Sequence, residues 1–224
     1  MNNWLRIIQI VVSRKRSKLW ASLLIVIGVF GLASSAILYA LQPSPPEYTN
    51  YLSILAKPPS SVRPSTKAIA NYSVAPYLPK YINIPSIGID KARIIRLGHF
   101  ADGQIATPNN IYDTGWYENS SLPGKPGAMF VFGHVSSWTA DGVFFNLNKL
   151  KPGNMVTIIR GDNKRYTYKV ITSKIYPYNN VNMHAVLSPV IKGRPGLNLM
   201  TCTGSVIKGT SEFNERLVVF TSLV

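Results

Sequence analysis

The sequence predicts a mainly β domain with short helices, preceded by one N-terminal transmembrane helix. From Lys80 to the C-terminus, short apolar or alternating runs are separated by Gly, Pro, Asn and Asp, as in strands joined by tight turns. This pattern favours a closed barrel or a sandwich over a fold of alternating strands and helices. The long uncharged apolar stretch, residues 19–41, lies ahead of this domain.

Residues 19–41 have the length and composition of a transmembrane helix. At 1.5 Å per residue this stretch would span about 34 Å, enough to cross a bilayer. Five basic residues and no acidic residue precede it. The positive-inside rule therefore predicts a cytoplasmic segment over residues 1–18 and an extracellular location for the chain after residue 41. A cleaved signal peptide is the alternative, although its apolar core is usually shorter, about 7–15 residues.

Residues 42–79 are predicted to form an extracellular linker. They are rich in Pro and Ser and show no long apolar pattern, which is typical of a linker that holds a domain away from the membrane. Residues 80–224 are long enough to bury a sizeable core and are predicted to be the single folded domain.

Local patterns predict the elements of this domain. The turn at residues 161–164 predicts a hairpin between the runs at 155–160 and 165–176. Alternation of Tyr166, Tyr168 and Val170 with polar residues predicts one buried face on the second strand. A helical turn is expected near residues 143–150. Further strands are expected at 81–84, 92–97, 128–134, 197–202 and 216–220.

The net charge of +15 is unevenly distributed. Residues 80–224 hold 16 of the 24 basic residues and 8 of the 9 acidic ones, so the folded domain is only moderately basic. A nucleic-acid groove would require a dense basic stripe with interleaved aromatic residues, and the sequence has none. The charge instead suits a domain near an anionic surface, and nucleic-acid binding is not expected.

Three strand-like runs each carry a reactive side chain at one end. Cys202, the only cysteine, ends the run 197–202; His134 ends the run 128–134; Arg216 begins the run 216–220. A lone cysteine in an exported domain cannot form an internal disulfide. Its thiol is therefore either a small buried apolar group or a working nucleophile, and the two other residues favour the nucleophile.

Together these three residue types describe a covalent acyl-transfer site. A thiol near its usual pKa of about 8.5 is mostly protonated at neutral pH, so a working Cys202 needs a base. His134 can take the thiol proton and later give a proton to a leaving amine. The guanidinium of Arg216 can stabilise the oxyanion that develops at the attacked carbonyl.

Six segments in this order resemble those of the sortase family. Leu-Asn-Leu-Met-Thr-Cys (197–202) resembles the sortase nucleophile strand, Phe-Gly-His-Val (132–135) the histidine segment, and Glu-Arg-Leu-Val-Val-Phe (215–220) the arginine strand. Residues 82–89, 122–127 and 143–153 are similar to further sortase segments. The resemblance covers about residues 80–224, and the predicted anchor and linker fit it as well.

This resemblance implies an eight-stranded β-barrel and a cysteine transpeptidase that needs no cofactor. Sortases cut a Leu-Pro-x-Thr-Gly-like sorting signal after Thr and hold the acyl group on the cysteine. They then pass it to an amine of the cell wall or of another protein. Carried over, Cys202 is the nucleophile, His134 the acid and base, and Arg216 the oxyanion or substrate clamp. Thr201 either contacts the substrate backbone or satisfies its hydroxyl locally.

The sortase class stays open. Residues 133–136 and 144–147 resemble class F, whereas the arginine directly before Leu-Val-Val resembles the commoner classes. No metal is expected, because Asp102, Asp113 and Glu118 are scattered. Asp141 is expected in a turn rather than as a partner of His134. His99 and His184 are expected to be ordinary surface or loop histidines. Residues 176–196 are expected to form either the wall of an apolar substrate groove or a long crossover loop.

Two alternatives to a transpeptidase remain at this level. The domain could be an exported β-barrel scaffold or adhesion module without activity, since a fold does not guarantee chemistry. It could also be a cysteine peptidase that releases its acyl-enzyme mainly to water. The leading hypothesis places a membrane-anchored sortase on the outside of the cell, with sorting-signal proteins and an amine acceptor as partners.

Overall fold

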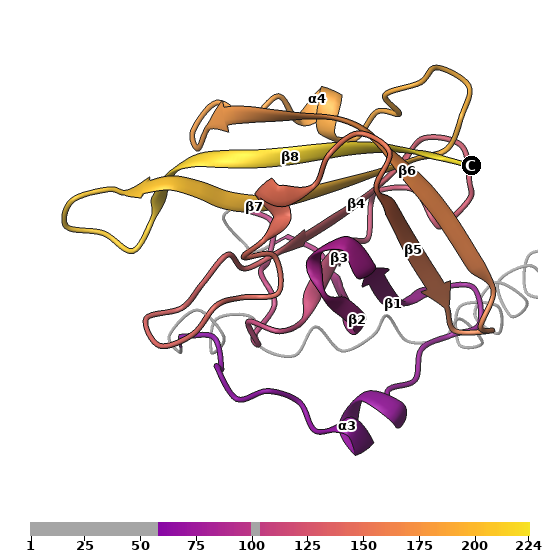
Figure 1. Cartoon of the computed structure of the whole chain (residues 1–224), viewed down its shortest axis with the longest axis horizontal. Helices are drawn as coiled ribbons and strands as arrows, with labels where there is room; N and C mark the ends of the chain where they lie inside the picture. Colours follow the sequence, from indigo (N-terminus) through magenta and orange to yellow (C-terminus); the bar gives the residue numbers. More distant parts are fainter. Residues whose placement is uncertain (1–57, 100–103) are drawn as a thin grey trace, which may run out of the picture. The chain divides into compact units, whose positions relative to one another are not determined.

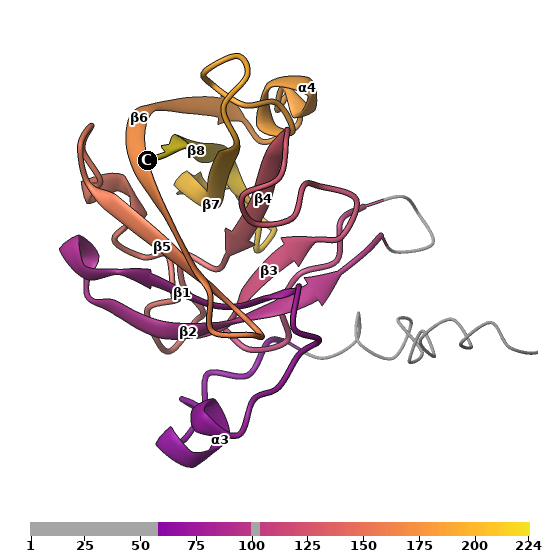
Figure 2. The same cartoon turned by 90° about the vertical axis from the view of Figure 1, so that its right-hand side faces the viewer.

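The alternating runs of the sequence form eight strands that close into one barrel (Figures 1 and 2). This computed structural model describes residues 58–99 and 104–224. Around the barrel the strands are hydrogen-bonded in the order β1-β2-β3-β4-β7-β8-β6-β5. The expected closed eight-stranded barrel is confirmed, and the sandwich alternative is excluded. The strands are β1 (Pro79–Ile84), β2 (Ile89–Leu97), β3 (Thr114–Tyr117), β4 (Ala128–Gly133), β5 (Met155–Arg160), β6 (Arg165–Pro177), β7 (Gly196–Val206) and β8 (Phe213–Leu223).

Two of the eight strand pairs, β2–β3 and β4–β7, are parallel, and the other six are antiparallel. The helices are short: α3 (Thr66–Ala70), α4 (Met183–Val186), and the 3-10 turns η1 (Pro85–Ile87) and η2 (Leu147–Lys149). The helical turn expected near residues 143–150 contains η2. Strands β6 and β7 both pair antiparallel with β8 and therefore run parallel to each other. Parallel strands need a crossover, which the chain makes through the segment that carries α4 (Figure 2).

Side chains on β4, β7 and β8 alternate between two faces, as the two-residue period of a strand requires. The side chains on one face belong to the hydrophobic cluster that fills the barrel, and every strand contributes side chains to this cluster. The alternate residues form a second cluster on the outer face. The interior set on these three strands is Met129, Val131, Leu197, Leu199, Leu217 and Val219; the outer set is Phe130, Phe132, Met200, Val218 and Phe220.

The predicted hairpin at residues 155–176 is present as β5 and β6. Asn163 in its turn has a φ of 65°, a left-handed conformation that Asn tolerates better than most residues. Tyr168 and Val170 point into the barrel, as the alternation predicted. In contrast, β3 is an element that the sequence pattern did not indicate. It has four residues, all buried, and so shows no alternation.

Residues 58–78, within the range predicted as a linker, pack against the barrel. Helix α3 contacts β2 (Figure 2). The hydroxyl of Tyr72 donates to the carbonyl of Ile94 at 2.6 Å, and that of Tyr81 donates to the carbonyl of Ile69. Burial raises the pKa of Tyr72 to about 12. Beside it, Arg93 forms a bidentate ion pair with the buried Asp113, at 2.7 and 2.8 Å.

Within residues 58–99 and 104–224, no helix is long and apolar enough to cross a membrane. The transmembrane helix predicted for residues 19–41 lies outside the described residues.

Candidate active site

Cys202 and Arg216 lie directly opposite each other on neighbouring strands. In the antiparallel pairing of β7 and β8, Met200 faces Val218 and Cys202 faces Arg216. Met200 and Val218 belong to the outer cluster. Since residues two apart on a strand point to the same side, Cys202 and Arg216 are also on the outer face. The two predicted site residues are therefore cross-strand neighbours.

His134 reaches the same level from the other side of β7. Strands β4 and β7 pair in parallel with a constant offset that ends at Phe132 facing Met200. His134 is two residues beyond Phe132, as Cys202 is two residues beyond Met200. Adjacent strands are about 4.8 Å apart. The register of three neighbouring strands thus brings together the cysteine, the histidine and the arginine, which are distant in sequence.

Thr201 maintains this register. Its side chain is buried on the interior side, and its hydroxyl donates to the carbonyl of Gly133 at 2.8 Å. That bond ties β7 to the end of β4, one residue before His134 and one before Cys202. The hydroxyl is thus satisfied locally, and a contact of Thr201 with a substrate backbone stays a prediction.

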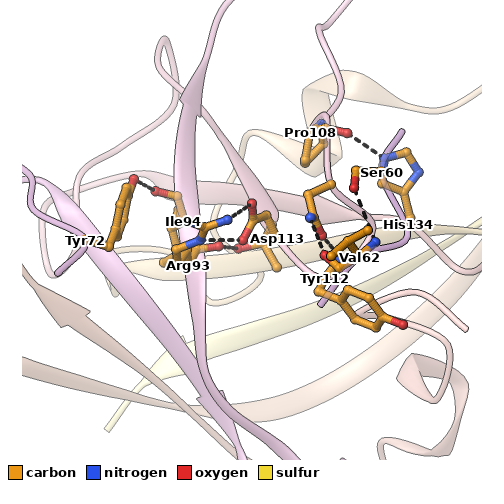
Figure 3. A network of polar contacts seen from close by, with 11 residues as sticks. Ser60, Val62, Tyr72, Arg93, Ile94, Pro108, Tyr112, Asp113 and His134 are labelled. Atoms are coloured by element: carbon orange, nitrogen blue, oxygen red, sulfur yellow. Dashed lines mark hydrogen bonds and ion pairs between the residues drawn. The ribbon is translucent and has the colours of Figure 1, made fainter. Parts of the chain in front are cut away.

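The imidazole of His134 is anchored by a backbone carbonyl. Its Nε2 lies 2.8 Å from the carbonyl oxygen of Pro108 (Figure 3). A carbonyl can only accept, so Nε2 carries a proton, and in the neutral ring Nδ1 is the unprotonated nitrogen. Burial lowers the pKa of His134, against a smaller raising effect of the Pro108 bond. The ring is therefore held as a neutral base that presents Nδ1.

The backbone around His134 is also fixed. The amide of Phe144 donates to the His134 carbonyl at 3.0 Å. A side chain at Gly142 would place its Cβ only 2.3 Å from that carbonyl oxygen, so this position needs glycine. Asp141, beside it, pairs with Ser136 in an isolated bridge, consistent with the turn expected there.

The thiol of Cys202 is protonated at neutral pH. Burial raises its pKa, and the charge of Arg216 lowers it by a smaller amount, while Glu212 adds to the increase. With the pKa of His134 lowered and that of Cys202 raised, the resting pair is a neutral thiol and a neutral imidazole. Such a pair must transfer a proton before or during attack.

Arg216 is held by the first residues of β8 and by the loop that precedes them. Nη1 donates to the carbonyls of Phe213 and Glu215 at 2.8 and 3.0 Å, and Nη2 pairs with the carboxylate of Glu212 at 2.9 Å. The guanidinium also lies 5.8 Å from the centre of the Tyr178 ring. Its side chain is only 15% exposed, so it is not a solvated residue at a strand start. Glu212 is a site neighbour that the sequence did not reveal, because nothing local marks it.

Residues 176–196 cover part of the outer face. Val186 of α4 packs in the outer cluster together with Tyr176, Phe130 and Val218. The buried Asn198 of β7 donates to the carbonyls of Val186 and Ser188 at 2.7 and 3.0 Å, which fastens the crossover to the nucleophile strand. Asn198 is a polar residue within the mainly apolar run 197–202. That exception to the pattern was the one feature of the sequence that could have marked Asn198 as a residue with a specific hydrogen-bonding role.

The other candidates are apart from this cluster of three residues. His99 contacts the Tyr117 hydroxyl through Nε2 at 3.2 Å and packs edge-on against its ring. His184 lies in α4 and is exposed. In the described part of the chain, no group of three or more His, Cys, Asp or Glu side chains is placed to hold a metal ion.

Comparisons with known proteins identify the family of this domain. A family model of the sortase domain matches residues 82–224, more than half of the chain. Comparison with curated proteins finds no match. Sortase C-1 from Actinomyces oris is 25% identical, with 74% of this chain and 83% of that chain covered and a TM-score of 0.50.

Two further solved structures share the fold. The sortase C2 of Group B Streptococcus pilus island 1 is 23% identical, over 74% of this chain and 82% of that chain, with a TM-score of 0.51. The sortase C of Streptococcus pneumoniae is 21% identical, over 76% of each chain, with a TM-score of 0.50. From the barrel, the ordered motifs and the match over residues 82–224, we conclude that this chain belongs to the sortase family, whose members are cysteine transpeptidases.

Proposed function

We propose that Cys202, His134 and Arg216 catalyse transpeptidation of a Leu-Pro-x-Thr-Gly-like sorting signal by a membrane-anchored enzyme. The observation that carries this proposal is the shared register of β4, β7 and β8, which brings the three residues to one level on the outer face. Membership of the sortase family supports the reaction type.

His134 begins the reaction by accepting the thiol proton at Nδ1. The thiolate of Cys202 attacks the Thr carbonyl of the substrate, and the carbonyl π electrons move to oxygen to form a tetrahedral oxyanion. When the oxyanion collapses, the C–N bond to Gly breaks, and His134 returns the proton to the leaving amine. The product is a thioester on Cys202. An incoming amine then attacks this thioester and loses its proton to His134. The C–S bond breaks, and the departing Cys202 thiolate takes that proton back from His134.

Arg216 stabilises the oxyanion. An arginine guanidinium stays positively charged at physiological pH. That of Arg216 belongs to the residue directly opposite Cys202 on the next strand. The Arg216 guanidinium contacts the start of β8 and Glu212 of the preceding loop and is partly buried, and a charge in a partly dehydrated site acts more strongly than one in water. The apolar outer cluster and the crossover that carries α4 provide a surface for the Leu and Pro side chains of the signal.

The anchor and location are part of the same proposal. The uncharged stretch at residues 19–41 and the basic residues before it support a single-pass protein with a cytoplasmic N-terminus and an extracellular domain. The acceptor is an amine of the cell wall or of another exported protein. Membership of sortase class F is also part of the proposal, because residues 133–136 and 144–147 resemble that class.

A peptide library tests the proposal. The full chain in detergent is incubated with Leu-Pro-x-Thr-Gly-like peptides, with and without an added amine, and the products are identified by mass spectrometry. A thioester of the N-terminal fragment on Cys202 and an amine-dependent product are expected. A thioester that yields only the free acid in the presence of amine would indicate a hydrolase. A folded protein that forms no thioester with any peptide would favour the scaffold alternative.

A further inference from the structure

A short exposed segment ahead of the barrel runs beside the loop that contacts His134 (Figure 3). We call residues 60–63 the strap and residues 106–112 the proline loop. The amide of Ser60 donates to the carbonyl of Asn109 at 2.7 Å, and the carbonyl of Ser60 accepts from the amide of Ile111 at 3.0 Å. The two segments therefore pair as a parallel β-bridge.

Two side chains extend this pairing. The Asn110 side-chain amide donates to the carbonyl of Val62 at 2.9 Å, while its Oδ1 accepts from the amide of Tyr112. The guanidinium of Arg63 lies over the ring of Tyr112, 4.1 Å from its centre. Every strap residue except Ser61 is exposed, so these contacts, rather than buried apolar area, hold the strap in place. Such a segment opens at a lower free-energy cost than a core strand.

The strap holds the proline loop at the point nearest His134. Pro108 has no amide hydrogen, so its own backbone can only accept. Among the described residues, positions 107–110 make two backbone hydrogen bonds to residues outside the loop: a local turn bond from the Asp113 amide to the Asn110 carbonyl, and the bond from Ser60 to Asn109. The bond from Ser60 is the one that comes from a segment distant in sequence. The other holds on the loop are farther from Pro108: Ala106 bonds to Gly98, and Ile111 bonds to Val143. Pro108 is itself buried, so its carbonyl is held by the packing of its ring and by the strap bond at the next residue.

We propose that the strap is a positioning element for His134. By pairing with Asn109 it keeps the Pro108 carbonyl against Nε2, which holds the proton on Nε2 and leaves Nδ1 as the base. An imidazole without this acceptor exchanges between its two tautomers and rotates, and a ring in the wrong tautomer cannot act as the base. A segment outside the barrel thereby controls the readiness of the active site. The catalytic consequence rests on the proposed function, but the tautomer of His134 does not.

Two variants of the full chain remove the strap contacts in different ways. Ser60→Pro deletes the amide that donates to Asn109. Asn110→Asp keeps the acceptor for Tyr112 but replaces the donor to Val62 with an oxygen. Thr139→Ala is the matched control, because Thr139 donates to the Ser61 hydroxyl at 3.1 Å and does not touch the proline loop. Thermal unfolding confirms that each protein is folded. Since the two variants remove different strap contacts, the same result in both excludes an effect peculiar to one substitution.

The first measurement is ¹⁵N NMR of the imidazole nitrogens at a pH where His134 is neutral, with its signals assigned by their loss in His134→Gln. We expect one Nε2–H tautomer in the wild type and in Thr139→Ala, and a mixture in the other two variants. The second is peptide cleavage, where kcat should fall about tenfold in both variants with KM within about twofold, as for a misplaced catalytic group. Thr139→Ala should stay within about twofold.

The two measurements separate the possible failures. If folded Ser60→Pro and Asn110→Asp both keep the single Nε2–H tautomer, the strap does not position His134 and the inference is overturned, whatever the activity. A mixed tautomer with unchanged kcat supports the positioning role and contradicts His134 as the base in the proposed function.

Discussion

The barrel interior and the outer face of β4, β7 and β8 are built from alternate residues of the same strands, yet they differ in chemistry. The interior side of β7 presents Leu197 and Leu199, which are fully buried among apolar neighbours. The outer side presents Met200 and Cys202, which are partly exposed. A two-residue period therefore lets one strand contribute to stability on one face and to a reactive site on the other.

Electrostatics differ in the same way. Among the described residues, Asp113 is the only charged residue that is buried, and it is paired with Arg93. On the outer face, burial lowers the pKa of His134 and raises that of Cys202, and both groups keep access to partners. Partial burial is thus what tunes the site, since complete burial would forbid charge and full exposure would leave the pKa values unchanged.

The largest expected effect is that of Cys202→Ala, a change on the outer face that should remove activity and leave stability nearly unchanged. Cys202→Ala should abolish thioester formation, because no other thiol exists in the chain. It should change the free energy of unfolding by no more than about 1 kcal/mol, since the sulfur lies on the partly exposed face. Mass spectrometry of the peptide-treated protein and thermal unfolding measure both. A folded variant that still cleaves the peptide would remove Cys202 from the mechanism.

Arg216→Lys should reduce kcat by about 10²–10³, the scale of a lost oxyanion donor, with little change in KM. Lysine keeps the charge, but its single nitrogen on a flexible stem cannot reproduce the planar fork whose separate nitrogens reach the carbonyls of Phe213 and Glu215 and the carboxylate of Glu212. Steady-state kinetics measure the change. Arg165→Lys, an exposed arginine at the start of β6, is the matched control. A kcat within about threefold of wild type would contradict the oxyanion role.

Adjacent residues of β7 sharpen the contrast in stability. Leu199→Ala should lower the free energy of unfolding by about 2–5 kcal/mol, because it opens a cavity in the closed barrel. Met200→Ala should cost less, since Met200 is partly exposed beside the site, but it should lower kcat/KM more than Leu199→Ala does. Urea unfolding and peptide kinetics on both variants test this. Equal losses of stability would mean that the outer cluster is as tightly packed as the interior.

The pH dependence of kcat/KM should reveal the lowered pKa of His134. The base works only when neutral, and a pKa below the usual value of about 6.5 keeps it neutral to lower pH. The acidic limb should therefore be half-complete below pH 6.5. As the pH falls, His134 takes up a proton in the unfolded chain near pH 6.5 and in the folded protein only at a lower pH. The contribution of His134 to stability is therefore fully present above about pH 6.5 and is lost as the pH falls through the lowered pKa. His134→Gln should flatten this loss of stability, and an acidic limb centred above pH 6.5 would contradict the burial effect.

The smallest expected effect concerns Glu212. Its carboxylate is 58% exposed, so its ion pair with Arg216 is screened by water. Glu212→Gln should lower the pKa of Cys202 slightly and speed thiol alkylation at neutral pH by about two- to threefold, the range of an exposed charge pair. Glu215→Gln is the control, since Glu215 is not among the groups that shift the Cys202 pKa. An unchanged alkylation rate would leave Glu212 with no electrostatic part in the site.

Local patterns were enough to predict the β5–β6 hairpin and the strand-like runs that carry Cys202, His134 and Arg216. Alternation and turn residues report which side of a strand is buried, and this depends mainly on neighbours in sequence. The four buried residues of β3 gave no such signal. A strand this short, buried throughout, lacks the alternation that marks one buried face.

The sequence by itself determined the class of fold, the type of chemistry and the residues proposed to perform it. Only the tertiary structure decided how His134 is held and how Arg216 is placed. The acceptor for His134 is the carbonyl of Pro108, 26 positions away, and a backbone carbonyl leaves no trace in residue type. The strap lies in a range whose Pro- and Ser-rich composition predicted a linker. Composition cannot show that such a segment pairs through its backbone with a distant loop, because every residue carries the same carbonyl and nearly every residue the same amide.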